Sequence, residues 1–247
     1  EYRKMVVPII DQTLARGKRV LVVGGTGLYV RALTEGLCDA PPADLKVREQ
    51  LWSECQGVGS ATLYDRLRGV DLVAASRIHP NDARRIIRAL EVYALTGRPI
   101  SSWWRQASAE LLQGHVTIIG INRDREELYR RIDERVLRMV YEEGVINEVR
   151  QLFRLPLSRT ARQVHGLLDI ELYLSEKSSL KDTISTWQQR VRNYAKRQMT
   201  WFKQTANIQW IDVSADERSW ETNARILDLL RRARIDQSTS VQQSVIS

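Results

Sequence analysis

The chain of 247 residues carries 38 Lys and Arg against 30 Asp and Glu, a formal net charge of +8, and 43% of its residues are hydrophobic. This balance is typical of a folded protein with a real core, and no apolar run reaches the roughly 18 residues of a membrane span. Two cysteines and three histidines without metal-ligand spacing exclude a disulfide framework and argue against a structural zinc site. We therefore expect a cytoplasmic protein, off the membrane, that binds a polyanion.

The beginning of the chain predicts an α/β layer. Val6, Ile10 and Leu14 recur every four residues, which is the period of one helix face. The apolar run at 20–23 then predicts a buried strand, which a glycine turn ends before another helix. Helix, strand and helix in this order indicate a parallel sheet.

The segment from about Asp44 to Gln113 predicts only helices. Asp44 is a candidate N-cap, Asn81 or Asp82 is another, and Gly97 ends the helix that follows. Because no strand pattern occurs here, we interpret the segment as a helical insertion.

The rest of the chain predicts a return to the sheet at 116–121. Asp124 and Glu127 have the spacing of a capping pair, so a helix should follow, and another is expected at 180–203. The Gln- and Ser-rich tail after Ala233 should fray. The expected parts are α/β at 1–38, the helical insertion at 39–114, α/β with basic helices at 115–233, and a flexible tail at 234–247.

The first candidate site is Gly24-Gly25-Thr26-Gly27, after the apolar run. Glycines at a strand end let the backbone approach a ligand, and the following helix offers free N–H groups to an anion. The Thr26 hydroxyl is then placed to donate to a phosphate. A purely structural turn fits the same residues, and spacing alone favours it. No G-x-x-x-x-G-K-[ST] loop occurs in the chain.

The second candidate is a cluster of three arginines, Arg84, Arg85 and Arg88, which follows His79-Pro80-Asn81-Asp82. Arg84 and Arg88 are four residues apart, so they share a helix face and can clamp phosphates. A solvated face with local salt bridges explains the cluster equally well.

The third candidate lies where the positive charge is concentrated. Residues 156–203 contain nine Lys and Arg against four acids, and no acid occurs from 184 to 203. On a helix with about 100° per residue, Arg192, Lys196 and Lys203 project within roughly 40° of one another. Aligned like charges repel by about 0.2–0.5 kcal/mol per pair, and a bound diphosphate or RNA backbone would offset this. We therefore favour anion binding over a solvated face.

These three stretches, in this order, resemble the bacterial tRNA dimethylallyltransferases. The matching stretches are Gly24 to Tyr29, His79 to Val92, Arg123 to Arg150 and Tyr194 to Phe202, within about 6–212. The resemblance implies an α/β fold, with a P-loop NTPase/kinase-like parallel sheet core and an all-helical insertion domain that binds the anticodon stem-loop. It implies transfer of a dimethylallyl group from dimethylallyl diphosphate to N6 of an anticodon-loop adenosine in tRNA, with Mg²⁺, by a monomer.

The resemblance also assigns residues, none of them as a metal ligand. The catalytic residues that it implies are Thr26 and Arg192. The diphosphate-binding residues that it implies are Gly24, Gly25, Thr26, Arg192 and Lys196. The tRNA-binding residues that it implies are Thr26, Arg48, Arg84, Arg85, Ile86, Ile87, Arg88, Gln163, Val164, His165, Gly166, Leu167, Leu168, Lys196, Arg197, Gln198, Met199, Thr200, Trp201, Phe202 and Lys203.

The chain departs from the family pattern in two ways. Leu167 and Leu168 stand where an aromatic and a basic residue are usual, and His165 stands where an apolar residue is common. The family's phosphate loop G-P-T-[AG]-[ST]-G-K-[ST], and its D-S-x-Q segment with the general base, would precede residue 1. We therefore expect the sequence to be the larger, C-terminal part of such an enzyme, and the isolated 247 residues to be inactive.

Other functions stay open on the residues alone. A non-catalytic RNA-binding remnant would keep the basic surface, and a nucleotide kinase of similar fold would not need it. A structural interaction module has little support in the sequence. Binding competition between tRNA and a nucleoside monophosphate would separate the enzyme from the kinase.

Overall fold

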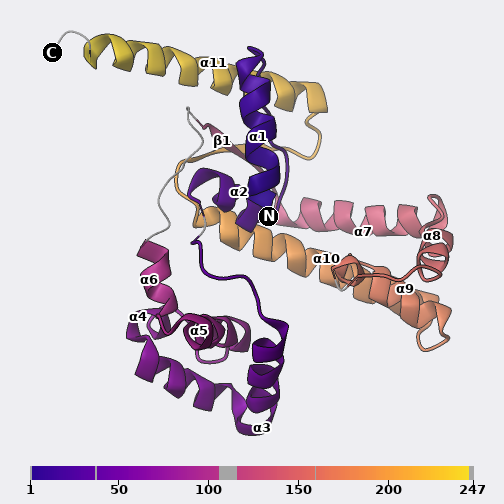
Figure 1. Ribbon diagram of the computed structural model, residues 1–247. Coiled ribbons are helices and arrows are strands. Elements are labelled where there is room, and N and C mark those ends of the chain that lie inside the picture. The colour runs from indigo at the N-terminus through magenta and orange to yellow at the C-terminus, as the bar shows by residue number, and fades with distance from the viewer. Residues whose placement is uncertain (1, 37, 106–115, 159, 245–247) are drawn as a thin grey trace. The chain divides into compact units, whose positions relative to one another are not determined.

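The computed structural model describes residues 2–36, 38–105, 116–158 and 160–244 (Figure 1). The chain divides into two compact units, Glu1–His115 and Val116–Ser247, which we call unit 1 and unit 2. Residues 106–115, where the helical insertion was expected to end, lie outside the described residues. In the described parts of the chain, no helix is long and apolar enough to cross a membrane.

Unit 1 begins with the two predicted helices, α1 (Tyr2–Ala15) and α2 (Gly27–Thr34). The strand predicted at 20–23 is wrong, because these residues form no strand and Leu21 and Val23 are 81% and 84% exposed. A strand needs a hydrogen-bonded neighbour, and no strand occurs among the described residues of unit 1. The run is therefore apolar without being buried.

The following segment of unit 1 consists of helices, as predicted. They are α3 (Leu45–Val70), which is kinked at Gly59, α4 (Leu72–Ala75), α5 (Ala83–Thr96) and α6 (Ile100–Arg105). The predicted caps Asp44 and Asp82 are confirmed, since each side chain accepts a hydrogen bond from the backbone N–H three residues on, at 3.0 and 3.1 Å. Gly97 ends α5 with a left-handed backbone, at φ +66°.

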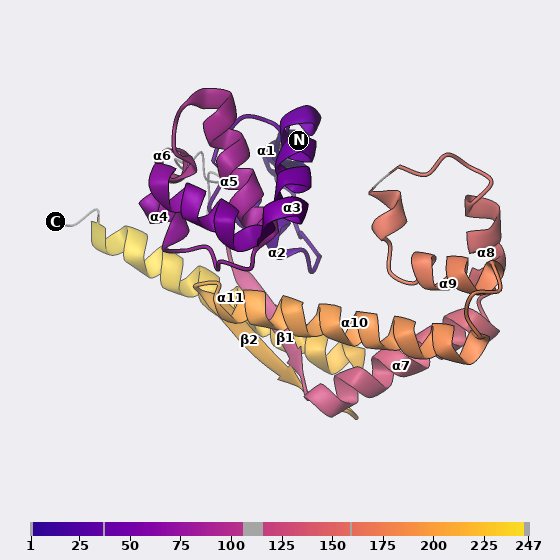
Figure 2. The same cartoon turned by 90° about the horizontal axis from the view of Figure 1, so that it is seen from below.

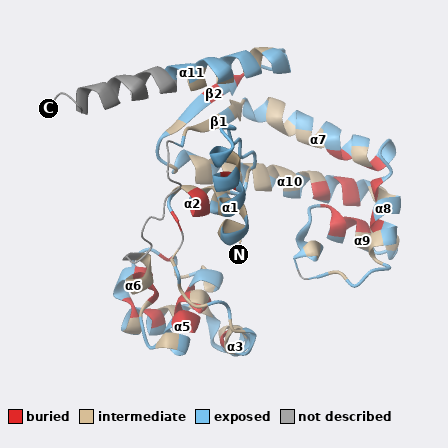
Figure 3. Cartoon of the chain, turned by 45° about the horizontal axis from the view of Figure 1, so that its top comes forward, coloured by how far each residue is buried: buried red, intermediate tan, exposed pale blue. Residues whose placement is uncertain are grey.

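The core of unit 1 lies between α3 and α5 (Figure 3). Leu63 and Leu67 of α3 meet Ile86, Ile87 and Leu90 of α5, and all five side chains are at most 2% exposed. Burial of each such side chain contributes about 1.5–3 kcal/mol relative to exposure. This face therefore fixes which side of α5 remains free for a ligand.

Unit 2 contains the sheet, which consists of β1 (Ile118–Arg123) and β2 (Ile208–Val213) in parallel. The register pairs Ile118 with Ile208 and continues to Arg123 with Val213. The strand predicted at 116–121 is thus confirmed with a start two residues later, whereas β2 was not predicted. Helices connect the two strands along the chain. Parallel strands need such a long crossover connection, because a short turn cannot join them.

The helices of unit 2 are α7 (Arg125–Tyr141), α8 (Val145–Leu152), the short 3₁₀ helix η1 (Ala161–Gln163), α9 (Leu167–Leu174), α10 (Leu180–Lys203) and α11 (Ser219–Ser244). The long helix α10 packs on α7 and on α9 (Figure 2). The helix predicted at 180–203 is confirmed. The element α11 continues past Ala233, after which we expected fraying.

The capping pair predicted before α7 is half correct. The Asp124 carboxylate accepts hydrogen bonds from the N–H groups of Glu126 and Glu127, at 2.9 and 3.1 Å. The Glu127 carboxylate does not return to the cap, because it binds Arg130 and Arg131 of its own helix. These hydrogen bonds lower the pKa of Glu127 to about 2.

Gly166 is the glycine of unit 2 that should tolerate a side chain least. Its φ is +89°, and an added Cβ would lie 2.3 Å from Cε2 of Trp187 on α10. We predict that Gly166→Ala lowers the free energy of unfolding by about 2–5 kcal/mol, from backbone strain and overpacking together. The control is Gly144→Ala, which has φ +71° and no atom within 4 Å. Equal losses in the two variants, measured by urea unfolding, would contradict the proposed clash.

Candidate functional site

Thr26 stands at the N-cap position of α2, directly after the glycine turn. Its carbonyl accepts the first hydrogen bonds of the helix, from the N–H groups of Tyr29 and Val30 at 2.9 and 3.2 Å. Its side chain is exposed and makes no capping hydrogen bond. The hydroxyl of Thr26 therefore remains available to a ligand at a helix end where partial positive charge favours an anion.

Arg192 of α10 is already paired with an acid. One terminal nitrogen of its guanidinium lies 2.6 Å from both carboxylate oxygens of Asp133 on α7, and the other donates to Gln189 at 2.9 Å. The sequence led us to expect a purely basic face on α10. The structure places the Asp133 carboxylate beside it. The negative charge that compensates Arg192 is the Asp133 carboxylate of α7, 59 residues away in the chain. Arg192 therefore does not require a bound anion to be compensated.

Four other cations of α10 have no acidic partner in the described part of the chain, namely Lys181, Lys196, Arg197 and Lys203. Lys196 and Lys203 are exposed and make no side-chain hydrogen bond or ion pair there. Arg197 is exposed and lies over the ring of Tyr194, with 5.8 Å from its Cζ to the ring centroid. The available positive charge of α10 is thus concentrated in its C-terminal half.

The remaining residues predicted to contact tRNA in this half are partly engaged within the protein. Thr200 donates its hydroxyl to the carbonyl of Lys196 at 3.0 Å. The partly buried members of the stretch are Gln198, Met199, Trp201 and Phe202. Their aromatic and apolar parts therefore serve packing as well as any contact with a ligand.

The loop before α9 divides between core and surface. Leu167 is 4% exposed and belongs to the core of unit 2, and Gly166 is buried against Trp187. The Leu167 side chain therefore serves packing, and the assignment of Leu167 to tRNA binding stays a prediction. The exposed residues of this loop are Gln163, Val164, His165 and Leu168.

His165 and Asp169 form a second polar cluster beside this loop. The His165 ring lies 4.7 Å from the Tyr194 ring, and its partial burial, together with the Arg197 charge, lowers the pKa of His165. Asp169 is 2% exposed, and no other residue of the described structure donates a hydrogen bond to its carboxylate oxygens. Arg190 Nε is 3.4 Å from one of these oxygens. Burial raises the pKa of Asp169, and Arg190 only partly opposes this.

The insertion contains a buried carboxylate that sequence analysis missed. The Glu91 side chain is fully buried, yet it accepts hydrogen bonds from Arg48 and Arg88 at 2.7 Å each and from the Asp44 N–H at 3.0 Å. Burial would raise the pKa of Glu91, but the two arginines outweigh this and hold it below its usual value. The signal in the sequence was an acid on the otherwise apolar face of α5, three residues after Arg88.

This network changes the role of several residues that were predicted to bind tRNA. Arg48 and Arg88 are paired with Glu91. For Arg88 this favours the alternative of local salt bridges over a phosphate clamp with Arg84. Ile86 and Ile87 are 0% and 1% exposed, so their side chains are enclosed in the protein, and their assignment to tRNA binding stays a prediction. Their place is the core between α3 and α5.

Arg84 and Arg85 remain on the exposed side of α5. Arg85 Nε lies 3.4 Å from the Asp82 carboxylate, whereas Arg84 has no such partner in the described structure. Thr26 and the α5 arginines belong to unit 1, and Arg192 and Lys196 belong to unit 2. That Thr26 and Arg192 share one cavity stays a prediction.

No metal cluster exists among the described residues, because no three His, Cys, Asp or Glu side chains converge there. Mg²⁺ commonly enters a site with substrate phosphates and only one or two carboxylates.

The sequence and fold match one family of proteins throughout. Residues 1–205 match the family model described as IPP transferase. The chain is 42% identical over 214 residues to the tRNA dimethylallyltransferase of Geobacter metallireducens, which covers 86% of this chain and 69% of that protein. It is 39% identical over 220 residues to the tRNA dimethylallyltransferase of Geobacillus thermodenitrificans, with 88% and 69% covered.

Solved structures agree with the sequence match. The full-length tRNA isopentenylpyrophosphate transferase from Bacillus halodurans is 32% identical, with a TM-score of 0.63 over 98% of this chain and 75% of that one. A eukaryotic dimethylallyltransferase acting on tRNA is 27% identical, with a TM-score of 0.70 over 92% and 59%. This chain therefore belongs to the IPP transferase family, and its α/β fold with a small parallel sheet and a helical insertion agrees with that of its relatives.

The Glu91 network should be essential to unit 1. We predict that Glu91→Gln lowers the free energy of unfolding by about 3 kcal/mol, the lower end for a buried ion pair that loses one partner, because both arginines keep some exposure. The control is Glu54→Gln, which removes an exposed ion pair with Arg66 and should cost less than about 1 kcal/mol. Thermal and urea unfolding measure both. A Glu91→Gln loss no larger than the control would contradict the network.

Asp169 should make stability depend on pH. Because its pKa is raised in the folded state, the folded protein holds the proton more tightly, so this stability is present below about pH 4 and is lost as pH rises through the folded pKa. We predict that Asp169→Asn gains stability relative to wild type between about pH 4 and neutrality. Urea unfolding across this range measures it. The control is the exposed Asp216→Asn, and parallel curves for wild type, Asp169→Asn and this control would contradict the prediction.

Proposed function

We propose that this protein transfers the dimethylallyl group of dimethylallyl diphosphate to N6 of an adenosine in the anticodon loop of tRNA. The observation that carries this proposal is the match of residues 1–205 to the IPP transferase family, with 42% identity to a tRNA dimethylallyltransferase. The free Thr26 hydroxyl at the start of α2 and the unpaired lysines of α10 support it.

The reaction requires control of negative charge on the leaving group. The bond between C1 of the prenyl group and the diphosphate oxygen breaks with its electron pair, while N6 of adenosine bonds to C1 and loses a proton. Donors that are fixed where this charge develops lower the barrier. Thr26 at the N-terminus of α2 and Lys196 on α10 are the groups of this chain best suited to that role.

Arg192 contributes in a different way from a free cation. Its pairing with Asp133 places its guanidinium firmly between α7 and α10, and its Nε–H stays without a partner in the described structure. A diphosphate beside α10 would therefore meet an oriented donor rather than a mobile one. Orientation in advance is what makes such a donor effective in a transition state.

Each unit, taken by itself, presents exposed cations that are suited to RNA phosphates. Lys196, Arg197 and Lys203 lie on α10, and Arg84 lies on α5. Phosphate contacts by such side chains provide affinity that weakens with salt. Mg²⁺ as cofactor, a monomeric state and a cytoplasmic location remain predictions of the resemblance.

The transfer assay tests the assigned donors. In the protein expressed from its complete reading frame, we predict that Thr26→Ala, Lys196→Gln and Arg192→Gln each lower kcat for prenyl transfer by about 10²–10³-fold, as loss of one transition-state donor typically does. The readout is the mass of modified adenosine in tRNA that was incubated with dimethylallyl diphosphate.

Asp133→Asn separates chemistry from packing. It breaks the same ion pair as Arg192→Gln, so both variants should lose similar stability. Asp133→Asn keeps the guanidinium and loses only its orientation, so its kcat should fall less than that of Arg192→Gln. Equal kcat in these two variants would remove Arg192 from the reaction. A wild-type protein that binds tRNA without modifying it would refute the proposed transfer and leave an RNA-binding function.

A further inference from the structure

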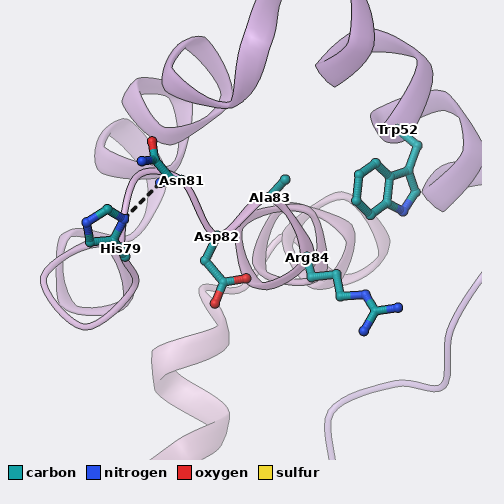
Figure 4. Close-up of a pocket in the computed structure, with 6 residues that line it drawn as sticks. All are labelled: Trp52, His79, Asn81, Asp82, Ala83 and Arg84. Atoms are coloured by element: carbon teal, nitrogen blue, oxygen red, sulfur yellow. Dashed lines mark hydrogen bonds between the residues drawn. The ribbon is translucent and has the colours of Figure 1, made fainter. Parts of the chain in front are cut away.

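Unit 1 contains an open pocket of about 520 Å³ (Figure 4). Residues from α3 and from the segment around the start of α5 line it, namely Trp52, His79, Asn81, Asp82, Ala83 and Arg84. Sites for small ligands measure roughly 300–1,000 Å³ and combine an apolar wall with a few polar groups. In the view of Figure 4, Trp52 and Arg84 lie at one end of the group and His79 at the other.

Trp52 provides the aromatic wall of the pocket. Its side chain packs against the core of unit 1 and also lines the pocket, so the core holds the ring in place. A ring held in this way is a platform for a nucleobase. Stacking on such a platform strengthens binding by about tenfold per base and accepts any base, because every base has a π face.

Arg84 provides the positive charge. Of the three arginines near the start of α5, Arg85 is paired with Asp82 and Arg88 with Glu91. In the described structure only Arg84 of these three lacks a hydrogen bond or ion pair. Its guanidinium can therefore bind a phosphate through two parallel hydrogen bonds without breaking an ion pair of the described structure. The one carboxylate in the pocket, that of Asp82, is engaged with Arg85.

His79 adds a donor at the other end. Its Nδ1 accepts a hydrogen bond from the Asn81 backbone N–H at 3.1 Å. In the neutral ring the proton then lies on Nε2, which becomes a donor. An aromatic wall, an unpaired guanidinium and an imidazole N–H are together the complement of a nucleoside phosphate.

We propose that this pocket holds one unstacked nucleotide of the RNA substrate, with its base against Trp52 and a phosphate against Arg84. The inference relies on the proposed function for the identity of the RNA. A base inside a duplex is covered on both faces and cannot reach the indole, so the nucleotide comes from a single-stranded loop or end. A free nucleoside monophosphate shares this chemistry and is the second source that the experiment must separate.

The first part of the experiment compares Arg84→Gln with Arg68→Gln, which removes the same charge from an exposed side chain of α3 that does not line the pocket. Affinity of the full chain for a fluorescent anticodon stem-loop RNA is measured by anisotropy at several salt concentrations. We expect Arg84→Gln to weaken binding about tenfold at low salt and to reduce the salt slope by about one, as loss of one phosphate contact does. We expect Arg68→Gln to change affinity by less than about twofold. Equal losses would indicate unspecific surface charge and overturn the proposal.

The second part locates the base. 2-Aminopurine replaces each loop position of the RNA in turn, and its fluorescence is quenched where it stacks. We expect one position to be quenched by wild type and by Trp52→Phe but not by Trp52→Leu. Thermal unfolding checks that the Leu variant is folded. If it is not, the wild-type scan still decides, because a scan without a quenched position overturns the proposal.

Competition identifies the source of the nucleotide. We expect an unpaired oligonucleotide to displace the RNA at concentrations where nucleoside monophosphates do not, and equal displacement by a monophosphate would overturn the RNA assignment. Prenyl transfer is measured in the same variants. Transfer by wild type, with RNA affinity unchanged in Arg84→Gln and Trp52→Leu, would refute the pocket alone. RNA binding that depends on Trp52 and Arg84, without transfer, would refute the proposed reaction alone.

Discussion

The Glu91 carboxylate is buried among apolar side chains, and a buried charge persists only where it is paired and hydrogen-bonded. Arg48 and Arg88 meet this need from two helices, and the Asp44 N–H adds a third hydrogen bond. The start of α3 is thereby joined to the middle of α5. An arginine that turned to a ligand would remove one of the three hydrogen bonds that compensate the burial of Glu91. The pocket beside Trp52 consequently depends on Arg84, which this network leaves free.

The same rule governs α10 in unit 2. Its Arg190 lies near Asp169 of α9, and its Arg192 lies near Asp133 of α7. Asp133 lies at hydrogen-bonding distance from Arg192, whereas Asp169 is held less well and its pKa is raised. The charge available to a polyanion is therefore smaller than the sequence count for 156–203 suggests. It is also more localised, because Lys196, Arg197 and Lys203 lie toward the end of the helix, whereas Lys181 is the one cation without an acidic partner at its described start.

Local features were predictable because neighbours within a few residues decide them. The caps at Asp44, Asp82 and Asp124 each bind an N–H two or three residues ahead, so their spacing is visible in the sequence. Pairing across long separations is not visible in this way. The partner of β1 lies about ninety positions on, from Ile118 to Ile208, and periodicity does not identify it. For that reason, the family resemblance predicted the fold better than the residue pattern did. The same resemblance assigned roles in tRNA binding to residues whose side chains pack in the core.

The loop before α9 shows how a family pattern can change without loss of a surface. Leu167 faces the core, so its replacement of the usual aromatic residue alters packing against the helices rather than a contact with RNA. Leu168 is 43% exposed, so replacement of the usual basic residue there does remove a cation. Beside it, His165 lies against Tyr194, and Arg197 lies over the same ring. Burial and the Arg197 charge lower the pKa of His165. His165 and Tyr194 together give this loop an aromatic surface, and unpaired bases bind such a surface by stacking.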